Sequence, residues 1–130
     1  MGPVNWLAVL LAAAIAVAVG IVWYGPLFRT GQQLFPGDSR PTGNYTLVFV
    51  VMLISAIMLG HNFARIGPET LGAKPWLYLM QSGGIAIAFV IPAVWLTFLR
   101  KGAGIGERLV ESGFWLTAYL AMGATFWALS

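Results

Sequence analysis

Few polar side chains in this chain could do chemistry, and one group of them lies close to an apolar segment. His61, Asn62 and Arg65 follow the apolar run that begins at Tyr45. Because positions three and four apart in a helix share a face, we expect these three side chains on one side of a helix. Polar groups at such a depth are candidate functional residues. The alternative is that they lie among headgroups and water, where Arg65 can extend to the membrane surface.

His61 is the candidate cofactor ligand. A single histidine could ligate a haem or a chlorophyll-type magnesium shared with a partner, or relay protons. A haem normally takes a second axial ligand, and Met58 cannot supply it because it lies on the same helix face. The primary prediction is therefore that the chain binds no cofactor, with a pigment at His61 as the alternative.

The remaining polar residues predict neither a catalytic site nor a metal site. Glu107 and Glu111 are one helical turn apart and resemble a carboxylate pair. Because Arg108 lies between them, we interpret them as solvated ion-pair partners. His61 has no positioned serine and acid that would complete a nucleophilic triad. The chain has no cysteine, which excludes thiolate ligands and thiol nucleophiles.

Composition predicts the environment that positions these residues. Hydrophobic residues make up 59% of the chain and charged residues 8%, far from the balance of soluble domains. The seven lysines and arginines are scattered between apolar runs and do not form a stripe, so nucleic-acid binding has no support. We therefore predict an integral membrane protein whose first partner is the lipid bilayer, with lipids bound to its surface.

Apolar runs separated by turn residues predict four transmembrane helices, which would form an all-α bundle with short loops and a single domain over residues 1–130. The expected spans are 4–25, 45–65, 76–99 and 108–129, each long enough to cross a hydrocarbon core of about 30 Å. Pro26 should end the first helix. Pro92 lies inside the third span and should kink it, because a proline leaves the carbonyl of Ala88 without its usual donor.

The distribution of basic residues predicts that both termini lie outside. The side that should be cytoplasmic carries Arg29, Arg40, Arg100, Lys101 and Arg108, and the other side carries Arg65 and Lys74. An excess of basic residues marks the cytoplasmic side. Tryptophans fall in two layers, as expected for interfacial belts, with Trp6, Trp76 and Trp127 in the outer one.

Small residues recur at every fourth position and predict close helix packing. The ladders are Ala8, Ala12, Ala16 and Gly20 in the first span, Gly113, Thr117 and Ala121 in the fourth, and Gly84 and Ala88 before Pro92 in the third. In lipid, such ladders let helix backbones approach closely. They could serve contacts inside the chain or an interface with another subunit.

Several segments together resemble an uncharacterised bacterial family, the one catalogued as domain of unknown function 1761. Its most specific part is the run Trp23-Tyr24-Gly25-Pro26-Leu27-Phe28, and Asn5-Trp6-Leu7-Ala8, Glu111-Ser112-Gly113 and Met122-Gly123 also match in kind. The resemblance implies a four-helix membrane protein, located in a bacterial inner membrane, and implies no function.

The expected function is that of a non-catalytic membrane subunit or assembly protein, which packs against other membrane subunits or against itself. One alternative is a small oligomeric transporter or channel, with Pro92 as a hinge and His61, Asn62, Gln81 and Glu111 along a polar route. A second alternative is a pigment- or quinone-binding accessory subunit of an electron-transfer complex, which rests on His61 and the aromatic content.

Overall fold

The computed structural model describes residues 4–23 and 41–130, and for residues 41–45 the backbone alone. Every regular element in this part of the chain is helical, which confirms the all-α prediction. The elements are α1 (Trp6–Val22), α2 (Pro41–Ile66), α3 (Pro68–Ala73), α4 (Trp76–Ile85), the π-helical turn η2 (Ala86–Val90), α5 (Ile91–Arg100) and α6 (Ile105–Ala128). The helix α4, the turn η2 and α5 follow one another directly and form one continuous helical segment.

The helices lie where the four spans were predicted, and their first or last residues differ from the predicted ones by a few positions. α2 begins at Pro41 and α6 at Ile105, each a few residues before the predicted start. Proline is favourable in a first helical turn because the N–H that it lacks would have no helical acceptor there. The short helix α3 was not predicted. It begins after Gly67, whose φ of 95° is a conformation that glycine adopts readily.

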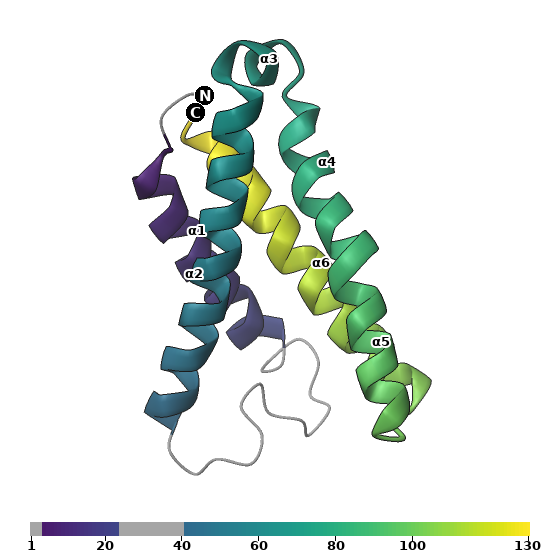
Figure 1. Cartoon of the computed structure of the whole chain (residues 1–130). Helices are drawn as coiled ribbons and strands as arrows, with labels where there is room; N and C mark the ends of the chain where they lie inside the picture. The colour runs from purple at the N-terminus through teal and green to yellow at the C-terminus, as the bar shows by residue number, and fades with distance from the viewer. Residues whose placement is uncertain (1–3, 24–40) are drawn as a thin grey trace.

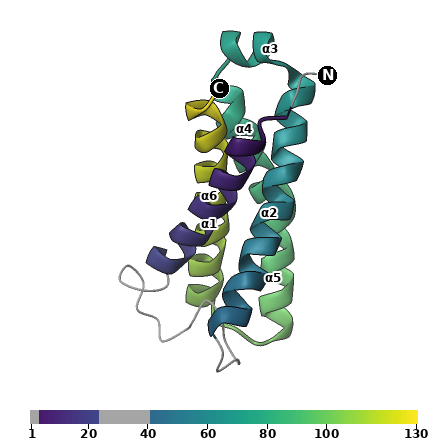
Figure 2. The same cartoon turned by 90° about the vertical axis from the view of Figure 1, so that its left-hand side faces the viewer.

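The long helical segments run alternately up and down. α1 packs against α2 and α6, and α4, η2 and α5 pack along α6 (Figure 1). Figure 2 shows α1 in front, alongside α6 and α2. The two ends of the described chain meet near α3, where the side-chain amide of Asn5 donates to the carbonyl of Leu129 at 3.1 Å. The connection from α5 to α6 lies at the opposite end.

The helices approach most closely at glycines. A Cβ atom added to Gly60 of α2 would lie 2.9 Å from the Val9 side chain of α1. One added to Gly83 of α4 would lie 2.9 Å from the Leu120 side chain of α6. These distances are shorter than real Cβ contacts allow. The glycines therefore set how near α2 comes to α1, and α4 to α6.

The predicted irregularity at Pro92 takes the form of a π-helical turn. The N–H of Ile91 donates to the carbonyl of Ala86, five residues back, which is the π pattern. Pro92 follows in the first turn of α5. A wider turn directly before a proline relieves the clash that its ring would make with the preceding turn of a regular helix.

Two helices of the described part are long and apolar enough to cross a membrane. They are Thr46–Ile66 within α2 and Trp76–Arg100, with mean hydropathies of 2.1 and 2.0. α1 is apolar but shorter, with 17 residues. α6 starts with polar turns that carry Glu107 and Glu111. By length and composition, the structure thus supports two of the four predicted spans.

Candidate functional site

The structure divides the predicted polar cluster near the end of α2. His61 and Arg65 are exposed, whereas Asn62 is half-buried and its amide donates to the Gln81 side chain of α4 at 3.0 Å. The expectation that all three share one side was wrong for Asn62, because neighbouring residues in a helix point about 100° apart. The predicted cluster therefore divides into two residues that face outward, His61 and Arg65, and one, Asn62, that faces α4.

His61 lies on the outer surface beside Trp6, whose ring is 5.8 Å away in an edge-to-face arrangement. Its Nδ1 atom lies 2.9 Å from the carbonyl oxygen of Ile57. A carbonyl can only accept, so Nδ1 carries the proton, and Nε2 is the atom left to bind a ligand. The described residues contain no group of three or more His, Cys, Asp or Glu that could hold a metal ion. Cofactor binding at His61 stays a prediction.

Polar side chains between the helices are paired with one another. Asn62 and Gln81 join α2 to α4, and the hydroxyl groups of Ser55 and Tyr119 lie 2.9 Å apart and join α2 to α6. Satisfied pairs of this kind hold helices together, and in lipid they contribute modestly, about 0.6 kcal/mol on average. They are structural contacts of the chain.

The small-residue ladder of α1 is used inside the chain. Ala8, Ala12 and Ala16 have no exposed surface and Gly20 is also buried, on the helix that packs against both α2 and α6. The ladder of α6 is less deeply placed, because Gly113, Thr117 and Ala121 are half-buried.

The ladder of the third span faces outward. Gly84 and Ala88 are exposed, and a Cβ atom added to Gly84 would meet nothing within 4 Å. The prediction that Gly84 and Ala88 form a packing face within the chain was wrong, because α4 turns its opposite side, with Ser82 and Gly83, toward α6. Their packing against another chain stays a prediction.

Large apolar side chains flank these two small residues. Met80 is 47% exposed and Ile87 is 60% exposed, at positions that share the helix face of Gly84 and Ala88. We call these four residues, Met80, Gly84, Ile87 and Ala88, the outer face. Only 17% of the apolar stretch in Trp76–Arg100 is buried within the chain, against 33% for Thr46–Ile66. Within the described part of the chain, the outer face is therefore a surface without a packing partner, and it is our candidate functional site.

The opposite end of the molecule is fixed by three tryptophans. Their indole N–H groups donate to three consecutive residues of α6: Trp23 to the carbonyl of Val110, Trp115 to the carboxylate of Glu111 and Trp95 to the hydroxyl of Ser112. The distances are 2.9, 3.0 and 2.8 Å. Because these indoles come from α1, α5 and α6 itself, they tie both neighbouring helices to the first turns of α6.

The guanidinium of Arg108 lies over the ring of Trp95, 5.6 Å from its centroid, and its Nε atom donates to the carbonyl of Ala103. A cation over an indole is attracted by the ring quadrupole. Glu111 is held by Trp115 on the same helix. Arg108 and Glu111 thus belong to the packing around the start of α6, and Glu107 is exposed.

A comparison with models of known protein families finds a match that covers most of the chain. A family model described as protein of unknown function, DUF1761, matches residues 7–127. The chain belongs to this family. The resemblance seen in the sequence motifs is thereby confirmed. No curated protein and no solved structure matches the chain.

Two motif segments of this DUF1761 protein meet in space. Trp23, from the first segment, covers Gly113, from the Glu111-Ser112-Gly113 segment, so closely that a Cβ atom there would lie 2.8 Å from the indole ring. The motif residues Tyr24, Gly25 and Pro26 lie outside the described residues. Sequence reasoning missed the contact between Trp23 and Gly113, although a motif glycine on an apolar helix was a usable signal of close approach.

Proposed function

We propose that this DUF1761 protein is a non-catalytic integral membrane protein that crosses the bilayer four times and packs against another transmembrane helix through its outer face. The observation that carries the proposal is the exposure of the small residues Gly84 and Ala88 beside the large side chains of Met80 and Ile87. A surface that meets only lipid gains nothing from small residues, whereas a helix packed in a notch between large side chains gains close contact.

The path of the chain supports four crossings. Asn5 and Leu129 touch each other, so the long helical segments start and finish at one end of the molecule. Exposed tryptophans lie near this end, namely Trp6, Trp76 and Trp127, which suits residues at a membrane interface. The short helix α1, with 17 residues, reaches about 25 Å along its axis.

The proposed location is a bacterial inner membrane with both termini outside. The five-to-two excess of basic residues that the sequence predicts for the cytoplasmic side supports this orientation.

The transporter alternative has less support. The side chains expected along its polar route are engaged elsewhere, since Asn62 binds Gln81 and Glu111 accepts from Trp115. The pigment alternative rests on an exposed histidine with one ring nitrogen already bonded. Neither alternative has a specific structural observation in its favour.

The test replaces Gly84 or Ala88 by leucine. A Cβ atom added at Gly84 would meet nothing within 4 Å in the described part of the chain, so the helices should fold as before while the outer face loses its notch. Ala14→Leu is the matched control, because Ala14 is an exposed small residue on α1. Mild-detergent purification from native membranes, followed by mass measurement of the complexes, reports on partner subunits and self-association together.

The proposal expects Gly84→Leu and Ala88→Leu to lose most of the associated protein, and Ala14→Leu to retain it. If all three variants retain the same partner or the same oligomeric state, the outer face is a lipid-facing surface and the proposal fails.

A further inference from the structure

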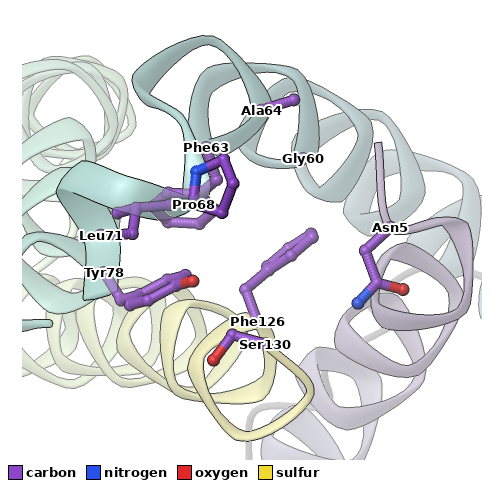
Figure 3. A pocket seen from close by; sticks show the side chains of 9 residues that line it. All are labelled: Asn5, Gly60, Phe63, Ala64, Pro68, Leu71, Tyr78, Phe126 and Ser130. Carbon is purple, nitrogen blue, oxygen red and sulfur yellow. The ribbon is translucent and has the colours of Figure 1, made fainter. Parts of the chain in front are cut away.

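A pocket of about 200 Å³ lies at the end of the molecule that α3 covers. Figure 3 shows it between α2, α3, α4 and α6. Its buried lining residues are Gly60, Phe63, Ala64, Leu71, Tyr78 and Phe126. An apolar cavity of about 150 Å³ is large enough to hold benzene. This pocket therefore has room for one aromatic ring with a short substituent.

Tyr78 places a hydroxyl group in this apolar pocket. The residue is 6% exposed, and Figure 3 shows its oxygen pointing into the space between Phe63 and Phe126. Its ring contacts Phe63 at a centroid distance of 4.9 Å. Among the residues that the structure describes, the hydroxyl has no hydrogen-bond partner. Buried tyrosine hydroxyls usually have one, so this group is placed for a molecule outside the chain.

The other polar groups at the pocket are already bonded. The side chain of Asn5 donates to Leu129 and accepts from the N–H of Ala8, and the hydroxyl of Ser130 donates to Trp127. None of the described side chains that line the pocket is charged. A charged guest would lose its hydration without gaining a counterion among these side chains, which disfavours it.

We propose that this pocket binds a small uncharged molecule of about one aromatic ring, with a single oxygen that accepts a hydrogen bond from Tyr78. The phenyl rings of Phe63 and Phe126, 5.2 Å apart, form the wall against which the ring of the guest packs. This site is separate from the outer face, and it needs no partner subunit.

A matched pair of probes tests the hydrogen bond. Acetophenone carries a carbonyl oxygen on a single ring, and α-methylstyrene has nearly the same shape with a methylene group in place of that oxygen. Each is titrated into the full chain in detergent while backbone amide shifts are followed by NMR. Comparing variants with the wild type at equal probe concentration cancels the partition of the probe into the micelle.

Tyr78→Phe removes the hydroxyl and keeps the ring. The proposal expects it to weaken acetophenone binding about 3- to 10-fold, the range for one neutral hydrogen bond, and to leave α-methylstyrene binding unchanged. Leu71→Phe, which enlarges a buried side chain of α3 at the pocket, should weaken both probes. The Leu71→Phe variant provides a second test of the pocket if Tyr78→Phe fails to fold.

The expected shifts gather on the residues of α2, α3, α4 and α6 that surround the pocket. Absence of saturable binding by either probe would mean that water alone satisfies the hydroxyl, and would overturn the proposal. Equal acetophenone affinity in the wild type and Tyr78→Phe would overturn it as well, as would shifts spread along the exposed helix surfaces.

Discussion

The indole nitrogen of Trp23 donates a hydrogen bond to the carbonyl oxygen of Val110, 87 residues away, at a distance of 2.9 Å. The same indole lies over Gly113, one turn further along α6. The end of α1 is thereby held against α6 at one place by a hydrogen bond and by a glycine with no side chain in the way. The two residues come from separate family motifs and fit each other.

A double-mutant cycle measures this fit. Gly113→Ala places a Cβ atom 2.8 Å from the indole and should destabilise the protein by about 1–3 kcal/mol, the usual range for overpacking. In the background of Trp23→Phe, whose smaller ring leaves space, the same substitution should be nearly neutral. Reversible unfolding in detergent gives the four free energies. Additive effects within about 0.3–0.5 kcal/mol would show that the residues are not coupled.

Gly123 should be the least replaceable glycine of α6. A Cβ atom there would lie 2.6 Å from the carbonyl oxygen of Tyr78 and closer still to the hydroxyl of Ser82. Because backbone is in the way, α4 and α6 would have to separate, and Gly123→Ala should strongly lower thermal stability. Gly106, on the same helix, has nothing within 4 Å, so Gly106→Ala should be neutral or stabilise by up to about 1 kcal/mol. Similar melting temperatures for the two variants would contradict this assignment.

The hydrogen bond between Asn62 and Gln81 should contribute about 0.6–1.7 kcal/mol to stability, the range found for such bonds between membrane helices. Asn62→Leu and Gln81→Leu should each destabilise the protein, and the double variant should lose less than the sum. The unfolding free energies of the three variants provide the measurement. A strictly additive double variant would indicate that water, and not the partner side chain, satisfies each amide.

His61→Gln should be silent. The side chain is exposed, and glutamine keeps a hydrogen-bonding group of similar reach. Folding, associated subunits and the absorption spectrum of the purified protein should match the wild type. Loss of a chromophore from His61→Gln, with normal expression and oligomeric state, would instead establish the pigment alternative, because glutamine lacks the basic ring nitrogen.

Labelling of single cysteines tests the orientation. The chain has no cysteine, so one introduced at Asp38 or at Ser130 is the only target of a thiol reagent. In intact cells an impermeant reagent should modify the cysteine at Ser130 and leave the one at Asp38 unmodified. The opposite pattern would invert the proposed orientation.

Hydropathy and turn residues were sufficient to predict where the long helices lie, because apolar runs bounded by glycine and proline mark where a helix begins and ends. The third span is the clearest case, since the predicted range 76–99 coincides with the segment Trp76–Arg100. The short helix α3 escaped prediction because its six residues carry too little pattern.

The side that each helix turns toward its neighbours was harder to predict. Ala8 and Gly84 both belong to small-residue ladders, of which that of Gly84 is the weaker, yet Ala8 is buried and Gly84 is exposed. Whether a ladder is buried depends on which helices are adjacent. The spacing of small residues indicates that a helix can pack closely, but it does not indicate which helix it packs against. The contacts of Tyr78 and Trp23 escaped prediction for the same reason, because their partners are distant in the sequence.

The π turn between α4 and α5 also works as a change of register. A π turn contains one residue more than the α-helical turn it replaces, and one residue corresponds to about 100° of rotation around the helix axis. The outer face, which lies on α4 and η2, therefore does not continue straight along α5, and Trp95 is rotated to where its indole reaches Ser112. Shortening Ala86–Val90 by one residue would preserve hydropathy and composition almost unchanged, while turning every side chain of α5 away from its present contacts.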